Sequence, residues 1–144
     1  MSQLPSNFDE LRIRILKHEG LNLKPYLDSV GKLTIGIGRN LTDCGISYDE
    51  AYDMLEHDLT RCEIDLVPYS WYSGLNQVRK GVLIELVFNI GLPRVLKFVN
   101  MIAALKAQDY IKASDELLNS LWAKQVGDKR ANSLAKCLLT GTYY

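Results

Sequence analysis

The sequence predicts an α+β fold, in which a small N-terminal lobe carries a β-hairpin and a helical lobe follows. Residues 33–38 (Leu-Thr-Ile-Gly-Ile-Gly) alternate between large apolar and small side chains, which is the two-residue period of a strand. Residues 76–90 end in a run that is apolar almost all round, which predicts the buried central helix of an all-helical lobe. A chain of 144 residues is long enough for one domain with two such lobes.

The composition is that of an ordinary folded protein. Its 17 basic and 17 acidic residues give a formal net charge of +0, so bulk charge predicts no nucleic-acid partner. No apolar run approaches the ~18 residues of a membrane span, and residues 1–9 are too polar for a signal peptide, so we expect no membrane insertion. The three cysteines (Cys44, Cys62 and Cys137) lack CxxC spacing, which favours reduced thiols in a cytosolic setting.

The first predicted helix runs from about residue 7 to residue 19. Gly20 comes directly after Glu19 and is a helix-stop signal, so the carboxyl of Glu19 lies at a helix C-terminus. The helix dipole disfavours negative charge there, which favours the protonated acid. A carboxyl group that stays protonated near neutrality is what a general acid requires.

The hairpin follows this helix. Its first strand is predicted at residues 26–28, after Pro25, because proline can open a strand but does not sit centrally in one. The loop 29–31 (Ser-Val-Gly) suits a three-residue turn with glycine in the left-handed conformation. This loop pairs Asp28 with Lys32, and residue 26 with Thr34.

Asp28 and Thr34 therefore emerge on one face of the hairpin. Gly36 and Gly38 share that face, and glycines in a strand often mark the close approach of a ligand or a backbone. The opposite face is expected to lie on a core and carries Leu33, Ile35 and Ile37. A two-residue or four-residue loop would instead place Asp28 and Thr34 on opposite faces.

The rest of the chain predicts helices. A short third strand is expected within residues 40–46, and the capping box Ser47-x-x-Glu50 begins a linking helix over about 48–65. A loop then covers residues 67–73. Further helices are predicted over 76–90, 93–105, 109–120 or beyond, and 128–139. The chain thus reads as one domain, with an N-terminal lobe of about 7–46, the linking helix, and a helical lobe of about 75–144.

The stretch from His18 to Gly38, H-E-G-L-x-L-x-x-Y-x-D-x-x-G-x-x-T-I-G-I-G, closely resembles the active-site region of phage-type lysozymes, glycoside hydrolase family 24. The similarity continues in residues 87–91, in Trp122 with Gln125 and Arg130, and in residues 140–143. It implies a lysozyme-like fold, in which the linking helix joins two lobes that flank a cleft with the active site.

The resemblance implies an endolysin-like muramidase. Such an enzyme hydrolyses the β-1,4 bond between N-acetylmuramic acid and N-acetylglucosamine in bacterial peptidoglycan. Glu19 is then the general acid, while Asp28 and Thr34 hold the water that attacks the anomeric carbon, with inversion. Two carboxylates in unlike environments suit this chemistry, which needs no metal and no organic cofactor. A zinc site is not expected, because Asn22 stands where the signature HExxH needs its second histidine.

Four further residues are candidates through the resemblance. Phe88 and Asn89 are implied to contact the sugar, although spacing alone would place Phe88 in the core. Arg130, otherwise a solvated helix residue, is implied to pair with Glu19 across the cleft. Arg39 departs from the family, where a histidine follows the glycine strand. It can contact the substrate or Asp28, but arginine does not titrate near neutrality.

The expected partner is peptidoglycan, and we expect a monomer. The protein would accumulate in the host bacterial cytoplasm and act on the cell wall after release, with a holin giving access to the wall. Two alternatives stay open. A lytic transglycosylase would use Glu19 alone, and a non-catalytic peptidoglycan-binding or structural phage subunit would need no acid. The presence of Asp28 and Thr34 argues against the transglycosylase, and the intact set of Glu19, Asp28 and Thr34 argues against the non-catalytic subunit.

Overall fold

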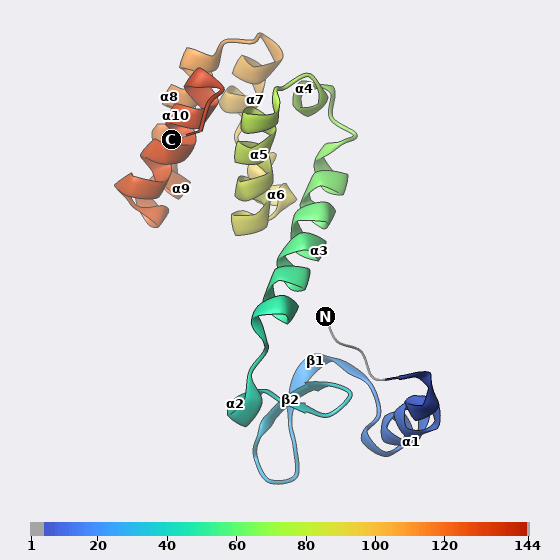
Figure 1. The fold of residues 1–144 in the computed structure, drawn as a ribbon. Helices are drawn as coiled ribbons and strands as arrows, with labels where there is room; N and C mark the ends of the chain where they lie inside the picture. The colour runs from blue at the N-terminus through green and yellow to red at the C-terminus, as the bar shows by residue number, and fades with distance from the viewer. Residues whose placement is uncertain (1–4, 144) are drawn as a thin grey trace. The chain divides into compact units, whose positions relative to one another are not determined.

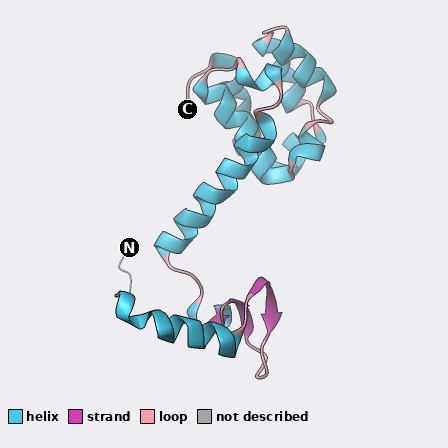
Figure 2. Ribbon diagram, turned by 90° about the vertical axis from the view of Figure 1, so that its right-hand side faces the viewer, coloured by secondary structure: helices cyan, strands magenta, loops and turns pink. Residues whose placement is uncertain are grey.

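A computed structural model describes residues 5–143 and confirms the predicted α+β class (Figure 1). The chain divides into two compact units, Met1–Met54 and Leu55–Tyr144, and the boundary falls within helix α3 (Tyr48–Leu66). The three strands form one antiparallel sheet in the N-terminal unit, drawn in magenta in Figure 2, and the described part of the C-terminal unit is built from helices. No described helix is both long enough and apolar enough to cross a membrane.

The N-terminal unit begins with a 3₁₀ turn, η1 (Ser6–Phe8), which leads into α1 (Asp9–Glu19). The helix ends where the sequence predicts. Gly20 has a φ of 72°, and its N–H donates to the carbonyl of Leu16 at 2.8 Å. Glycine adopts this left-handed φ without side-chain strain, so the helix stops directly after Glu19.

Strands β1 (Asn22–Leu27) and β2 (Leu33–Gly36) form the predicted hairpin, and its register is confirmed. Tyr26 pairs with Thr34, and the N–H of Asp28 donates to the carbonyl of Lys32 at 2.9 Å. The short strand β3 (Arg39–Asn40) pairs with β2, which gives the order β1-β2-β3.

Strand β1 is longer than predicted and contains Pro25. It lies at the edge of the sheet, and its register with β2 shifts between Asn22 and Tyr26. Edges and bulges are the places in a sheet where a proline without an N–H is tolerated.

The predicted core face of β2 is wrong. Thr34 is 4% exposed, whereas Leu33 and Ile37 are 41% and 48% exposed. Among the side chains that the structure describes in the N-terminal unit, Thr34 alone is buried. The apolar residues around it therefore do not build a core within this unit.

A short helix, α2 (Leu41–Cys44), replaces most of the expected third strand. Asn40 caps it, because its Oδ1 accepts the N–H of Asp43 at 3.0 Å. The hydroxyl of Thr42 accepts the N–H of Leu33 at 2.8 Å, and the Lys32 ammonium pairs with Asp43 at 3.1 Å. These side chains fasten α2 to the start of β2.

Helix α3 begins at the predicted capping box, where Ser47 Oγ accepts the N–H of Glu50 at 3.1 Å. The predicted helix over 93–105 is divided in two by a turn at 96–98, and the helices at 70–73 and 121–126 were not separately predicted. The helices after α3 are α4 (Ser70–Ser73), α5 (Gln77–Ile90), α6 (Leu92–Val95), α7 (Val99–Lys106), α8 (Tyr110–Leu118), α9 (Leu121–Val126) and α10 (Asp128–Thr140).

Helix α5 is the centre of the C-terminal unit, as its apolar sequence predicts (Figure 1). Leu83 and Leu86 are 0% exposed, and α4, α6 and α10 pack against the helix. All the buried apolar side chains of the described chain belong to this unit, from Cys62 to Leu138. The three cysteines are free thiols, with Cys44 exposed and the other two buried.

Candidate active site

Glu19 is exposed at the end of α1, and its side chain lies against Gly38. A Cβ built on Gly38 would come within 2.8 Å of Glu19 Oε2 and 2.9 Å of its Cδ. Gly38 also has a φ of 79°, which favours glycine. Of the two glycines on the predicted glycine face, Gly38 is a place of close approach and the group that approaches it is the carboxyl of Glu19, whereas a Cβ on Gly36 would meet nothing within 4 Å.

Asp28 closes the hairpin turn with its own carboxylate. Its Oδ1 accepts the N–H of Val30 at 2.9 Å and the N–H of Lys32 at 2.8 Å. Both hydrogen bonds that the described residues make to this carboxylate end on Oδ1, which fixes its orientation. Oδ2 is thus the oxygen that remains for an external ligand.

Thr34 lies on strand β2 and contacts Lys32 as well. Its hydroxyl donates to the carbonyl of Lys32 at 3.0 Å. Asp28 and Thr34 therefore bind the N–H and the C=O of one residue, Lys32. Because the proton of the hydroxyl is engaged, its oxygen is left as an acceptor.

The two carboxylates differ in exposure. Glu19 is exposed and Asp28 is half-buried in the turn. The turn accounts for this difference, because hairpin backbone surrounds Asp28, whereas Glu19 ends its helix. The position of the Glu19 carboxyl is instead limited by its close contact with Gly38.

Arg39 is fixed to the first turn of α3. Its Nη1 and Nη2 donate to the two carboxylate oxygens of Glu50 at 2.7 and 3.1 Å, and Nη1 also donates to the carbonyl of Gly45 at 3.2 Å. This bidentate pair holds the pKa of the Glu50 carboxyl below its ordinary value and raises the pKa of Arg39. The contact of Arg39 with substrate or Asp28 stays a prediction.

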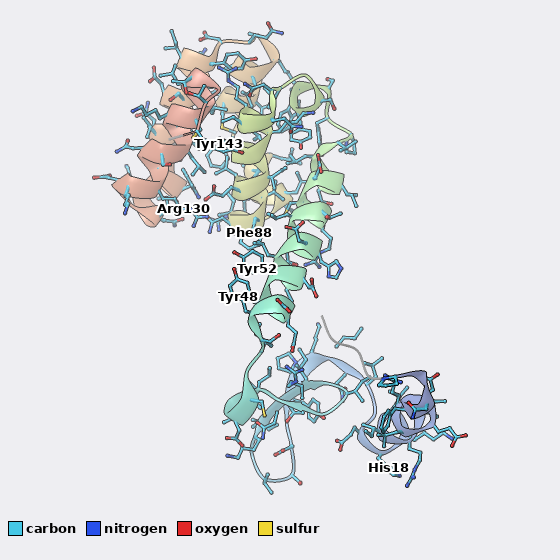
Figure 3. All side chains as sticks on the ribbon, in the orientation of Figure 1. His18, Tyr48, Tyr52, Phe88, Arg130 and Tyr143 are labelled. Atoms are coloured by element: carbon cyan, nitrogen blue, oxygen red, sulfur yellow. The ribbon has the colours of Figure 1, made fainter. Side chains whose placement is uncertain are left out.

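Phe88 and Arg130 belong to the C-terminal unit, where Figure 3 labels both. Phe88 is 47% exposed near the end of α5. The two side chains line one pocket of about 520 Å³, together with residues of α3 and α5.

Arg130 forms an ion pair with Glu85. Its Nε donates to Glu85 Oε1 at 3.2 Å, and its Nη2 lies 3.1 Å from the same oxygen. No sequence pattern indicated this partner, which is 45 residues away along the chain. The pairing of Arg130 with Glu19 stays a prediction.

Asn89 contacts a buried tryptophan. The indole N–H of Trp122 donates to Asn89 Oδ1 at 2.8 Å, and Trp122 is 3% exposed. The amide N–H₂ of Asn89 is the group that remains for a ligand. Within residues 5–143, no three His, Cys, Asp or Glu side chains gather in a way that could hold a metal ion.

Comparison with known proteins shows to which family this chain is similar. The model of the family described as phage lysozyme matches residues 16–136. An endolysin of Salmonella phage P22 is 32% identical over 77% of this chain and 79% of its own length. A probable T4-type lysozyme of Dictyostelium discoideum is 27% identical over 86% of this chain and 90% of its own. The pre-baseplate central spike protein Gp5 of Enterobacteria phage T4 is 30% identical over 87% of this chain, which spans 27% of that longer protein.

Proposed function

Since this chain belongs to the phage lysozyme family, we propose that it is a muramidase, which hydrolyses the β-1,4 bond between N-acetylmuramic acid and N-acetylglucosamine in peptidoglycan. One observation supports this proposal most directly. Asp28 and Thr34 bind the same residue, Lys32, on the hairpin whose following segment contacts Glu19 at Gly38. An acid, a carboxylate and a hydroxyl are thereby gathered on one short stretch of chain.

Each of the three groups has a distinct role in an inverting hydrolysis. Glu19 donates its proton to the glycosidic oxygen as the bond to the anomeric carbon breaks. Asp28, through Oδ2, and Thr34, through its hydroxyl oxygen, orient a water molecule on the other side of the sugar. That water attacks the anomeric carbon and gives its proton to Asp28. The reducing end of N-acetylmuramic acid is the product.

The other candidate residues contribute to binding of the glycan. The exposed ring of Phe88 and the free amide N–H₂ of Asn89 contact the glycan, and Arg130 and Arg39 support the site. The N-terminal lobe (about 7–46), the linking helix (about 48–65) and the helical lobe (about 75–144) work as one catalytic domain. The protein acts as a monomer on the cell wall after release from the host cytoplasm, with a holin for access.

A second candidate function follows from the spike relative. That protein carries a similar stretch within a much longer chain. A particle-associated subunit that binds or opens the wall locally is therefore the alternative to a free endolysin.

The first test compares two conservative variants with the wild type on purified peptidoglycan. Glu19→Gln removes the proton donor and is expected to lower the rate about 10²–10⁴-fold without changing the unfolding midpoint. Asp28→Asn keeps a carbonyl oxygen for the N–H groups of Val30 and Lys32, so the turn persists while the water loses its base. An active Glu19→Gln protein would rule out its catalytic assignment.

Mass spectrometry of the released fragments identifies the reaction. Reducing N-acetylmuramic ends would establish hydrolysis and support the water-holding role of Asp28 and Thr34. Anhydro-muramic ends would establish a lytic transglycosylase, which has no use for that water. No release by the wild-type protein would favour the binding or structural alternative.

A further inference from the structure

A small pocket of about 220 Å³ lies in the C-terminal unit, far from the proposed sugar contacts. Helix α4, the segment before α5, the end of α7 and the start of α8 enclose it. Helices α4 and α6 lie at opposite ends of α5 (Figure 1). At a rise of about 1.5 Å per residue, Gln77 at the start of α5 lies about 16 Å along the helix axis from Phe88. This pocket is therefore separate from the one that Phe88 and Arg130 line.

The inner wall of this pocket is apolar. Trp71, Leu75 and Leu105 form it and are 8%, 7% and 3% exposed. The ring of Trp71 also packs against that of Tyr69, with 5.4 Å between the ring centroids. Side chains that are packed into a core in this way move little, so the wall is preformed for a ligand.

Four polar side chains surround this wall: Ser70, Lys106, Gln108 and Tyr110. Within residues 5–143, none of the four side chains takes part in a hydrogen bond or an ion pair. The guanidinium carbon of Arg79 lies 3.5 Å from the centre of the Tyr110 ring, which fixes the ring and leaves its hydroxyl accessible. Two hydroxyls, one amide and one ammonium group are therefore available to a ligand.

Gln108 holds its position at a cost in backbone energy. Its φ of 56° is left-handed, and every other described residue with a positive φ is a glycine. Its N–H donates to the carbonyl of Leu105 at 3.1 Å, and the N–H of Asp109 donates to that of Ala104 at 2.8 Å, a pattern that usually has glycine at this helix end. Strained residues are often found at binding sites, so the side chain of Gln108 is a candidate for ligand contact.

Hydrogen-bonding groups around an apolar wall suit a sugar ring, which carries hydroxyls at its edge and C–H groups on its faces. The volume is below the roughly 300–1,000 Å³ of pockets for drug-sized ligands, so it suits one ring rather than a chain. The amide of Gln108 both donates and accepts, as the acetamido group of an amino sugar does, and Lys106 donates to a hydroxyl or carbonyl oxygen.

We propose that this pocket binds one N-acetylhexosamine residue of the cell-wall glycan, away from the bond that is cleaved. The identity of the sugar rests on the proposed function. Because the pocket is far from Phe88, the sugar that it binds is not the sugar at which cleavage occurs. A second contact of this kind holds the enzyme on an insoluble wall, since two linked sites bind a polymer more tightly than one.

Binding is tested first, because it does not depend on turnover. The ¹⁵N-labelled protein is titrated with methyl N-acetyl-β-D-glucosaminide. NMR follows the indole N–H of Trp71, the side-chain amide of Gln108 and the backbone amide of Leu105. Saturable shifts are expected at all three groups. The absence of saturable shifts, or equal shifts with glycerol, would overturn the inference.

The variant Gln108→Gly separates binding from folding. It removes the side-chain amide but gives the left-handed position a residue that adopts it without strain, so the unfolding midpoint should not fall. Binding of the sugar should weaken about 5-fold or more, because the amide contributes at least one hydrogen bond. Unchanged binding in this variant would contradict the proposal.

A matched pair of lysine variants tests the ammonium group. Lys106→Gln should weaken binding of the sugar about 5-fold. Lys124→Gln removes the same charge from helix α9, outside the pocket, and should bind as the wild type does. Equal weakening in the two variants would mean that net charge, not the pocket, governs the response.

An activity measurement separates this inference from the proposed function. The Gln108→Gly variant should have a KM several-fold higher than the wild type on insoluble peptidoglycan, with the same kcat. On soluble glycan fragments too short to reach both sites, its kcat/KM should equal that of the wild type. Equal loss on both substrates would overturn the role of a second contact. A wild-type protein that cleaves neither substrate would overturn the proposed muramidase alone, because the titration reports sugar binding separately.

Discussion

The two units of this molecule are stabilised in different ways. The C-terminal unit encloses a contiguous apolar core, with Leu83, Leu86 and Leu138 at 0% exposure. In the N-terminal unit, Thr34 is the one buried residue among the described side chains, and leucines such as Leu23 are up to 82% exposed. Burial of apolar surface, at about 25 cal/mol per Å², therefore contributes mainly to the C-terminal unit.

Polar contacts take the place of a core in the N-terminal unit. The hairpin turn is closed by Asp28, α2 is capped by Asn40, and Arg39 binds Glu50 at the start of α3. The three proposed catalytic residues belong to this unit. Local hydrogen bonds thus set the geometry of the proposed chemistry, while the core of the other unit supplies most of the stability.

The largest effect is expected from shortening a core leucine. Leu83→Ala should lower the free energy of unfolding by about 2–5 kcal/mol, because it leaves a cavity beside fully buried neighbours. The matched change Leu23→Ala in the N-terminal unit should stay within about 0.5 kcal/mol. Urea unfolding followed by circular dichroism measures both. Equal losses would show that the two units are not stabilised differently.

A smaller effect, on catalysis, is expected at Gly38. Gly38→Ala places a methyl group where the Glu19 carboxyl now lies, so the acid must move. A displacement of about 1 Å can reduce a rate about 10²-fold. Gly31→Ala is the matched control, because its φ of 81° imposes similar backbone strain and its Cβ would meet nothing within 4 Å.

Turnover of peptidoglycan and unfolding midpoints are measured together for these two glycine variants. We expect similar midpoints and very different rates. Equal rates would mean that the position of the Glu19 carboxyl beside Gly38 does not matter for catalysis.

The smallest effect concerns the exposed pair of Arg39 and Glu50. Arg39 lowers the pKa of Glu50 in the folded protein. The pair therefore stabilises the fold fully at pH values above 4.5, the ordinary pKa of this carboxyl group. This contribution is lost as the pH falls through the lower folded pKa. Arg39→Gln should therefore have a slightly lower unfolding midpoint than the wild type near neutrality, and the two curves should converge in acid. A difference that does not change with pH would contradict this explanation.

The sequence predicted well those features that local chemistry determines. The loop Ser29-Val30-Gly31 fixed the pairing of Tyr26 with Thr34, and Ser47 with Glu50 marked the start of α3. Gly20 marked the end of α1. The long apolar run of α5 was recognised because its burial does not depend on knowing its neighbours. The assignment of Glu19, Asp28 and Thr34 as catalytic residues came from the spacing of one short motif and stays a prediction.

Features that depend on distant partners were missed. Helix α2 has four residues, too few for a periodic pattern, and Lys32 and Leu33 help to hold it in place. The exposed apolar face of β2 was misread as a core face, because alternation marks a strand but not what covers it. The partner of Arg130, Glu85, and the gathering of Trp71 with Gln108 in one pocket arise only when separate segments pack.

Pro25 has a consequence for how this protein behaves at high concentration. A sheet edge with free N–H groups and exposed leucines is a template on which a second chain can add a strand. Strand β1 has Leu23 and Leu27 exposed at such an edge, but Pro25 offers no N–H, and the register shift beside it interrupts the ladder. A second chain therefore finds no continuous ladder of N–H groups on this edge, so we expect the exposed leucines of β1 not to lead to strand addition.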